Sequence, residues 1–401
     1  MKTVDVGGLP VGDDHPPRIV GVLNVSRESP YDPSVFDDPA EAAAYVDDAL
    51  IDQGADVVDV GLESANKRFD VLSAEQELDR LDVAVETLDR VEGDAVFSIE
   101  TRYAAVADEA LSRGFDAIND VCGFADPEMP AVAEAHDVAV VKMASPPDLD
   151  RPGAVDDVDW AAERSPDWAA NASFVDKVYA SLERGGLTGK TIVDPAFGGW
   201  SETKTLADDR QTFERLREFR ALGRPVLVSI NRKNFLKDVV DRSTEDALPA
   251  SLGATSLAVD RGAHVIRTHD VAATRDAALI GHAFDRDRVR TEHVEELAVT
   301  NARELARHLE RVGGDPATAR AGVDRAVAVT DLGPEETDSL QAVAADCGLV
   351  VAGGDRSILA GSAGEFAALA SELEGETRRL EGVAGALDRL IPMEKTYTGW
   401  G

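Results

Sequence analysis

The stretch TSLAVDRGAHVIRTHD, residues 255–270, contains the pattern that decides the fold. A helical segment ends at Arg261-Gly262, where glycine supplies the backbone conformation that commonly terminates a helix. A short apolar run follows at once and ends in the polar residues Arg267-Thr268-His269-Asp270. Helix, glycine, apolar strand and polar end, in that order, predict one unit of a parallel α/β sheet.

The same unit recurs along the chain, with glycines such as Gly114 and Gly223 ending helices before strands. The apolar runs are continuous rather than alternating, which is typical of strands buried on both faces of a parallel sheet. Eight runs are predicted as strands: Ile19–Val25, Val57–Gly61, Val96–Glu100, Ala117–Val121, Val138–Met143, Thr191–Phe197, Pro225–Ile230 and His264–His269. Eight regular units favour an α/β fold of the (β/α)8 TIM barrel type, and a doubly wound open sheet is the alternative.

The chain has 401 residues, whereas a typical barrel has about 250. We therefore predict a barrel over residues 18–284 and a small C-terminal α/β extension over residues 285–401. The extension is expected to contain two strands, Ala326–Thr330 and Leu349–Ala352, and a long helix toward Leu390. Two strands form little core of their own, so we expect the extension to dock on the barrel or on a second subunit, and we expect a homodimer.

Acidic residues dominate the charge of the chain. The sequence has 76 Asp and Glu against 41 Lys and Arg, for a net charge of −35, and the acids are spread over its whole length. This spread indicates a solvated acidic surface of the kind found in halophilic proteins, where high salt screens self-repulsion. Binding of calcium or a polycation is the alternative. Such a surface would repel phosphates, so we exclude nucleic acid as a partner.

Cysteine content and apolar segments narrow the cellular context. Cys122 and Cys347 are too few for a disulfide framework or a thiolate metal site. No apolar run approaches 18 residues, and the N-terminal segment lacks the apolar region of a signal peptide. We therefore expect a cytoplasmic protein with no membrane partner.

Polar side chains follow every predicted strand. Because active sites of TIM barrels lie at the carboxyl ends of the strands, these side chains are expected to meet at one mouth. The cations among them suit an anionic ligand, whereas the acids and amides suit a heterocycle with amide-like donors. The residues indicate a substrate with a polar ring at one end and phosphate at the other. In chain order they are Asn24, Glu63, Glu100, Asn119, Lys142, Asp194, Lys233, Arg267 and His269.

Each of these residues also has a structural interpretation. Asn24 could cap a loop, Asp194-Pro195 could start a turn, and Lys233 could pair with an acid on the rim. A single histidine such as His269 is more often structural than a ligand-binding group. The prediction therefore depends on the whole set and its location. The Gly-rich turn at 353–357 could hold an anion, but we interpret it as a plain turn before a helix.

These segments resemble the signatures of the dihydropteroate synthase family, in the right order and spacing over about residues 18–284. The matching segments are Gly21–Ser26, Asp59–Ser64, Ser98–Thr101, Ile118–Asp120, Asp194–Gly198, Arg232-Lys233 and Gly262–Val271. The resemblance implies a transferase of folate biosynthesis. It would join 6-hydroxymethyl-7,8-dihydropterin diphosphate to p-aminobenzoate or a related arylamine, giving dihydropteroate and pyrophosphate.

The resemblance also implies a role for each residue. The diphosphate would be held by Asn24, Arg267 and His269, and Asn24 would bind Mg²⁺ together with phosphate oxygens. The pterin would be held by Glu100, Asn119, Asp194 and Lys233. The catalytic set would be Asn24, Lys233, Arg267 and His269, which would stabilise charge on the leaving diphosphate.

The sequence departs from the family pattern at several positions. Glu100 stands where the family has Asp, Asn231 replaces a Ser, and Lys142 stands where His is common. The segments 27–32 and 65–67 differ from the usual loops after the first two strands, and the family uses the second of these around p-aminobenzoate. The pterin and phosphate parts are therefore largely intact, whereas the arylamine part is altered.

Two other functions fit parts of the pattern. A pterin-dependent methyltransferase domain would share the barrel and the pterin-binding Asn and Asp. Because a methyl-pterin carries no diphosphate, the three cations Lys233, Arg267 and His269 favour the synthase. A non-catalytic pterin-binding paralogue is the second alternative, suggested by the altered loops.

Overall fold

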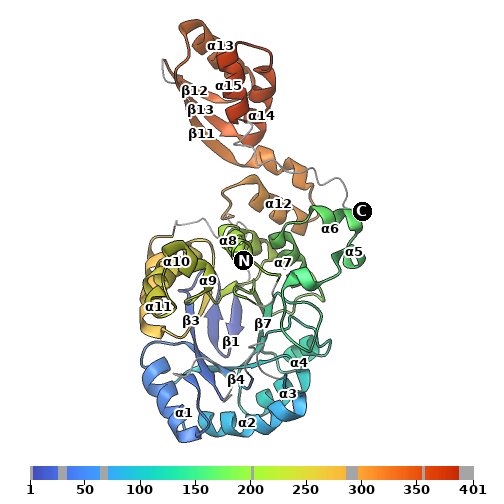
Figure 1. The fold of residues 1–401 in the computed structure, drawn as a ribbon, viewed down its shortest axis with the longest axis vertical. Coiled ribbons are helices and arrows are strands. Elements are labelled where there is room, and N and C mark those ends of the chain that lie inside the picture. The colour runs from blue at the N-terminus through green and yellow to red at the C-terminus, as the bar shows by residue number, and fades with distance from the viewer. Residues whose placement is uncertain are drawn as a thin grey trace. The chain divides into compact units, whose positions relative to one another are not determined.

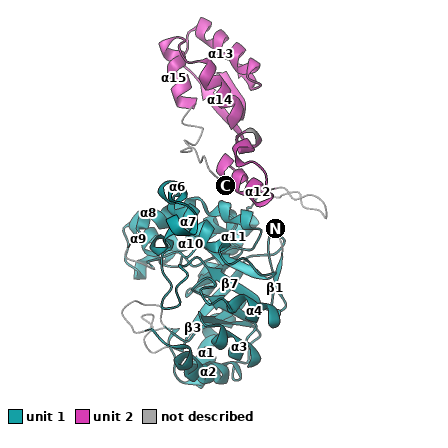
Figure 2. Ribbon diagram, turned by 90° about the vertical axis from the view of Figure 1, so that its right-hand side faces the viewer, with its two compact units in different colours: residues 1–287 teal, residues 288–401 magenta. Residues whose placement is uncertain are grey.

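The computed structural model describes residues 3–25, 34–63, 71–199, 203–285, 297–354 and 357–387. The chain forms two compact units, residues 1–287 and 288–401, which Figure 2 shows in different colours. In the described ranges, no helix is both long and apolar enough to span a membrane.

The first unit is a (β/α)8 TIM barrel, as predicted (Figure 1). Its eight parallel strands are ordered β8-β7-β6-β5-β4-β3-β10-β9, and a parallel bridge between Val193 and Val226 joins the two ends of this order. The strands are β3 (Arg18–Asn24), β4 (Val57–Gly61), β5 (Val96–Thr101), β6 (Ala117–Asp120), β7 (Ala139–Met143), β8 (Thr191–Asp194), β9 (Leu227–Val228) and β10 (Val265–Thr268).

Helices surround this sheet (Figure 1). Local sequence sets their starts: Asp38 caps the first helix ahead of Pro39, and Ser73 forms a capping box with Gln76. The first helix continues in π-helical turns over Val46–Ile51. The helices are α1 (Pro39–Tyr45), α2 (Ala74–Leu88), α3 (Ala104–Ser112), α4 (Met129–Ala135), α5 (Trp160–Glu163), α6 (Pro166–Asn171), α7 (Phe174–Glu183), α8 (Leu206–Glu214), α9 (Asn234–Val240), α10 (Leu248–Asp260) and α11 (Val271–Ala283).

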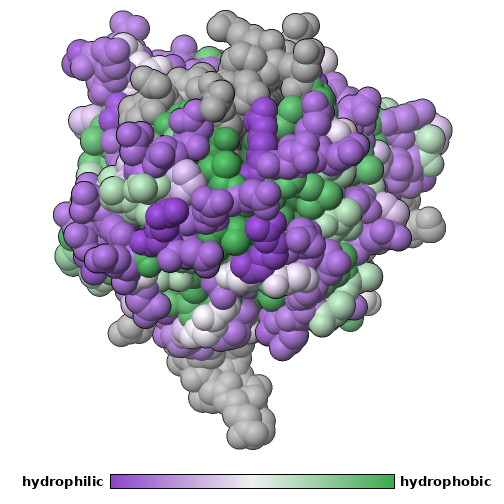
Figure 3. All heavy atoms as spheres, turned by 90° about the horizontal axis from the view of Figure 1, so that it is seen from below, coloured by the Kyte–Doolittle hydropathy of each residue, from purple (hydrophilic) through white to green (hydrophobic). Residues whose placement is uncertain are grey.

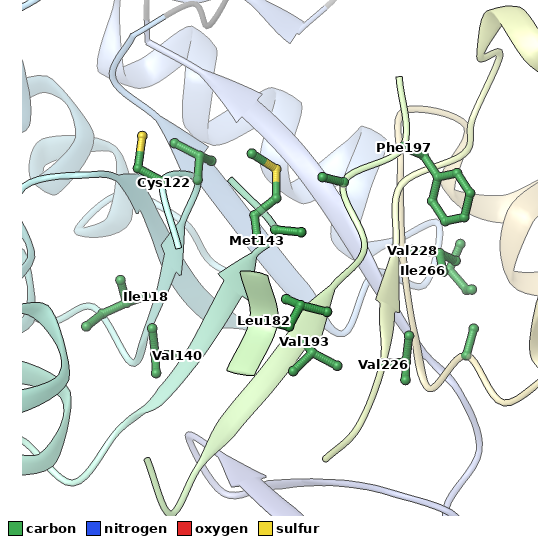
Figure 4. Close-up of a cluster of buried hydrophobic side chains, with 14 of the residues drawn as sticks. Ile118, Cys122, Val140, Met143, Leu182, Val193, Phe197, Val226, Val228 and Ile266 are labelled. Carbon is green, nitrogen blue, oxygen red and sulfur yellow. The ribbon is translucent and has the colours of Figure 1, made fainter. Parts of the chain in front are cut away.

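Side chains alternate between two apolar layers along each strand, as the pleat requires. On β4, Val58 and Val60 belong to the layer between the barrel and its helices, whereas Val57 belongs to a second layer inside the barrel. Figure 4 shows part of the first layer, with Val140 and Val193 among its members. The alternation decides which residues can reach the mouth.

A β-hairpin that was not predicted packs against the inner layer at the amino ends of the strands. It consists of β1 (Val4–Val6) and β2 (Leu9–Val11), joined through Gly7-Gly8 with positive φ angles. Asp13, just after it, accepts hydrogen bonds from Arg220 Nη2 at 2.7 Å and from His264 Nε2 at 3.0 Å. The hairpin therefore covers the end of the barrel opposite to the carboxyl ends of the strands.

The second unit is a small α/β unit with a three-stranded antiparallel sheet ordered β11-β13-β12. The prediction of two strands is wrong, because the central strand was missed. The predicted long helix toward Leu390 is two helices with Gly375 at positive φ between them, and Leu390 itself lies outside the described residues. The elements are α12 (Ala302–Arg311), β11 (Asp324–Val329), α13 (Pro334–Asp346), β12 (Val350–Gly353), β13 (Ser357–Ser362), α14 (Ala363–Glu372) and α15 (Arg378–Leu387).

Candidate functional site

Arg267, on β10, connects to side chains from two other strands at the carboxyl end of the barrel. Its Nε lies 2.8 Å from Asp59 Oδ2 on β4, and its Nη2 lies 2.5 Å from Glu100 Oε2 on β5. The two carboxyl groups hold one edge of the guanidinium and raise the pKa of Arg267 above its ordinary value, although burial opposes this. Arg267 is therefore a charged and oriented group within the barrel.

Asp59 is a site residue that the sequence analysis did not single out. Its carboxylate is buried and also accepts hydrogen bonds from Ser98 Oγ at 2.6 Å and Asn119 Nδ2 at 2.8 Å. The sequence did contain a signal for this residue, because Asp59 is a carboxylate within an apolar run. That run forms β4, and all residues of β4 are buried. A buried carboxylate needs partners, so it marks a polar network.

Glu100 lies at the centre of the mouth, beside Asn119 and Arg267. Burial raises its pKa to about 7; Arg267 opposes the shift and Asp59 adds to it. Glu100 and Asn24 approach Gly61 from two sides: a Cβ there would lie 3.2 Å from Asn24 Oδ1 and 3.8 Å from Glu100 Oε1. Glycine at this strand end therefore leaves room for both side chains.

Asn24 is oriented by its neighbour Ser34. Its Nδ2 donates to Ser34 Oγ at 2.9 Å, which turns Oδ1 toward Gly61. The oxygen of Asn24 thus faces the same part of the mouth as Glu100.

Asp194 and Lys233 form the opposite side of the mouth. Burial raises the pKa of Asp194 to about 6, although Lys233 opposes the shift, and Ala196 N donates to its carboxylate at 2.7 Å. Burial, with the charge of Arg267, lowers the pKa of Lys233 to about 8. Gly198, at φ +114°, makes room for the lysine: a Cβ there would lie 3.0 Å from Lys233 Nζ.

His269 is a neutral imidazole at neutral pH. Burial lowers its pKa to about 3, and the positive charges of Arg267 and Lys233 add to this effect. Its chain neighbour Asp270 makes a bidentate pair with Arg232, at 2.8 and 3.0 Å, which ties the segments after β9 and β10 together. Seven of the nine polar residues that were expected at the mouth therefore lie at or just after the carboxyl ends of the barrel strands, namely Asn24, Glu100, Asn119, Asp194, Lys233, Arg267 and His269.

The family model for pterin binding enzymes matches residues 20–269. The chain belongs to this family. A match of this extent covers the whole mouth described above, from Asn24 to His269.

Two relatives and one solved structure show what this chain is similar to. A probable bifunctional folylpolyglutamate synthase/dihydropteroate synthase of Halobacterium salinarum is 35% identical over 265 residues, which are 66% of this chain and 31% of the relative. The dihydropteroate synthase of Bacillus subtilis is 29% identical over 63% of this chain and 83% of its own. A Thermus thermophilus dihydropteroate synthase structure with 4-aminobenzoate has a TM-score of 0.53 at 29% identity, covering 71% of this chain and all of that one. The chain therefore spans about a third of the halobacterial relative.

Two polar strand ends of the barrel are engaged by other parts of the protein. Lys142 lies on the outward side of β7, where its Nζ donates to the carbonyl oxygens of Leu182 in α7 and of Arg184 and Gly186 just after this helix. The prediction that every strand end supplies the mouth is therefore wrong for Lys142. Glu63 is engaged at the rim by Arg102 and by Leu72 N, the latter at 3.0 Å.

The altered loops of the chain fall outside the described residues. Segment 27–32 and segment 65–67 belong to the ranges 26–33 and 64–70, which the structure does not describe. Asn231, another departure from the family pattern, donates to Asp270 Oδ2 at 3.0 Å and so supports the Arg232 pair.

Proposed function

We propose that the chain is a dihydropteroate synthase. It condenses 6-hydroxymethyl-7,8-dihydropterin diphosphate with p-aminobenzoate or a related arylamine, and releases pyrophosphate. The observation that carries the proposal is the composition of the barrel mouth, where Arg267, Lys233 and His269 lie beside carboxyl and amide groups. The similarity to the dihydropteroate synthases of Bacillus subtilis and Thermus thermophilus supports it.

The ring-binding side consists of carboxyl and amide groups. Glu100, Asn119 and Asp194 offer acceptors and donors at fixed positions, as the polar edge of a pterin requires. Lys233 adds a donor next to Asp194. Their burial excludes water, which strengthens each hydrogen bond to the ring.

The diphosphate side has one permanently charged cation and two groups whose charge depends on pH. Arg267 stays protonated, Lys233 is charged below about pH 8, and neutral His269 can donate one hydrogen bond. As the bond between the pterin methylene and the diphosphate breaks, negative charge grows on the leaving group. Fixed cations stabilise that charge more in the transition state than in the bound substrate.

Mg²⁺ fits the mouth as a diphosphate-bound ion rather than as an ion in a protein cage. Within the described ranges, no group of three or more His, Cys, Asp or Glu could hold a metal. Asn24 Oδ1 is one oriented oxygen, and Mg²⁺ is commonly bound by few protein oxygens together with substrate phosphates. When bound there, the ion would neutralise charge on the diphosphate.

The proposal extends to the state of the protein. We infer a homodimer, supported by exposed apolar side chains on and after the neighbouring helices α10 and α11: Leu257 is 51% exposed, Ile280 56% and Phe284 83%. We also infer a cytoplasmic, halophilic protein in which residues 18–284 carry the reaction and residues 285–401 serve another role.

The deciding experiment measures pyrophosphate release from the pterin diphosphate in concentrated KCl with Mg²⁺, with and without p-aminobenzoate. We expect release with the arylamine, its loss in K233A and R267A, and near-normal release in K237A. Lys237 is the matched control, because it lies on α9, which begins directly after Lys233, and its Nζ donates only to Thr244 Oγ1 at 2.7 Å among the described side-chain contacts. Absence of release with every arylamine tested would refute the synthase.

A further inference from the structure

Asp59 takes no part in the function as proposed, yet it is bonded to groups on both sides of the mouth. We propose that Asp59 is a positioning residue that orients Arg267 and Asn119 together and so couples diphosphate binding to ring binding. The inference rests on the proposed function, because that function assigns the two sides. It concerns how the site works rather than what it binds.

The geometry places Asp59 between the two sides. Its Oδ2 accepts from Arg267 Nε and from Asn119 Nδ2, both at 2.8 Å, while Oδ1 accepts from Ser98 Oγ at 2.6 Å. The partners come from β10, β6 and β5, so one carboxylate on β4 connects four strands of the barrel in all. Moving either the arginine or the asparagine alone would break a bond to the same oxygen atom.

Asp59 acts through these partners rather than on the substrate. It is 1% exposed and borders a small cavity inside the barrel, which apolar residues and Arg18, Ser98, Asn119 and Arg267 also line. The cavity has a volume of about 30 Å³, which suffices for about one water molecule. A pterin ring is far larger than this cavity, so the ring would not reach Asp59 through it.

An ionised carboxylate is an acceptor only, and this fixes the orientation of both neighbours. Asn119 must turn its NH2 group toward Asp59, so its carbonyl oxygen points the other way. The Nε edge of Arg267 must likewise face Asp59, so the opposite edge of the planar guanidinium points away from β4. A neutral amide at position 59 would accept these bonds more weakly and would allow either neighbour to turn.

The negative charge of Asp59 also balances Arg267 inside the barrel. The ion pair has side-chain exposures of 19% and 1%, and a guanidinium this deeply buried would be costly without a partner. A positioned arginine that is already desolvated needs little rearrangement when the diphosphate binds. Asp59 therefore prepares the anion side at the same time as the ring side.

The test uses D59N in the full-length protein, with D56N as its matched control. Asp56 precedes the same strand at its amino end, where it accepts from Ile19 N at 2.8 Å and pairs with Arg18. Binding of the pterin diphosphate and of 6-hydroxymethylpterin, which lacks the diphosphate, is measured by calorimetry, and thermal unfolding is followed in parallel. D59E replaces D59N if the latter does not fold.

We expect D59N to weaken the diphosphate ligand about tenfold or more, which corresponds to about 1.4 kcal/mol, and to weaken 6-hydroxymethylpterin less. D56N should bind both ligands as the wild type does. In an R267A background, D59N should weaken the binding of both ligands by the same factor, and this factor should be smaller than in the wild-type background. The reason is that the contribution of Asp59 through Arg267 is already lost in R267A. A purely structural role would lower the unfolding temperature without this dependence on Arg267.

Two results would overturn the inference. One is wild-type affinity of D59N for both ligands, and the other is an equal loss of affinity with and without Arg267. If the wild type itself binds neither ligand, the proposed function fails and the inference fails with it. If the wild type binds both and D59N is unchanged, only the role of Asp59 is refuted.

Discussion

Burial moves the pKa values of opposing groups in the mouth toward neutrality. It raises that of Asp194 to about 6 and lowers that of Lys233 to about 8. The two groups lie close enough that the charge of each favours the ionised form of the other. Ionisation of the site therefore changes within the range in which enzymes are assayed, and the proposed roles require one ionised form of each group.

We predict a bell-shaped pH dependence of kcat/KM for pyrophosphate release. The rate should rise as Asp194 ionises through about pH 6 and fall as Lys233 loses its proton through about pH 8. In K233R the falling limb should disappear or move well upward, because arginine stays protonated. A falling limb that stays at about pH 8 in K233R would assign it to another group.

Lys142 is a buried titratable group outside the mouth, and burial lowers its pKa to about 7. Its ammonium group is fully buried and has three backbone carbonyl oxygens as acceptors, two of them at 2.9 and 3.0 Å. We predict that K142M lowers the free energy of unfolding by about 3 kcal/mol, because these buried carbonyls lose their donor. Urea unfolding measures the change. K190M, which removes a more exposed pair with Asp137, should cost less than about 1 kcal/mol.

The contrast between Lys142 and the true mouth residues could have been anticipated from strand alternation. Side chains two positions apart on a strand point to the same face, and Val265, which points into the barrel, lies two positions before Arg267. The same spacing from an inward apolar residue applies to Asn119 and Asp194. Lys142 has the parity of Val140, which packs against the helices. The inward set was predictable on this basis, whereas the individual hydrogen-bond partners depend on register between strands, which no single sequence contains.

At the scale of elements, the barrel strands were predictable and two sheet elements were not. The eight barrel runs are apolar and six of them begin within three residues after a glycine, so only their ends differ from prediction. The β1–β2 hairpin has three-residue strands and includes Pro10, which weakens the apolar pattern. Strand β13 contains Gly361 and is bounded by serines, so its sequence resembles a loop, yet pairing on both sides stabilises it.

The N-terminal hairpin should contribute to stability through Asp13. Two buried groups, Arg220 and His264, both bond to this carboxylate and hold its pKa well below the ordinary range. We predict that D13A lowers the free energy of unfolding by about 3 kcal/mol, because a buried arginine loses its partner. D14A, at an exposed position, should change it by less than about 0.5 kcal/mol. Equal effects in denaturant unfolding would show that the hairpin is not held in this way.

At the scale of the whole molecule, the surface and the proposed diphosphate ligand both carry negative charge and repel each other. The chain carries −35, and Figure 3 shows one face covered largely by hydrophilic residues with smaller apolar areas between them. The cations of the mouth are few and largely buried, so a diphosphate approaching from solution first meets a negative field. The same field destabilises the folded chain, because carboxylates at the surface repel one another.

Salt should therefore improve both stability and substrate capture in this protein. The screening length falls from about 10 Å at 0.1 M to about 3 Å at 1 M salt, so repulsion between surface carboxylates is largely removed over this interval. We predict that the unfolding temperature rises and the KM for the pterin diphosphate falls between these concentrations of KCl. Sucrose, which does not screen charge, should raise the unfolding temperature without lowering KM. A KM that is independent of KCl would mean that the mouth is electrostatically isolated from the acidic surface.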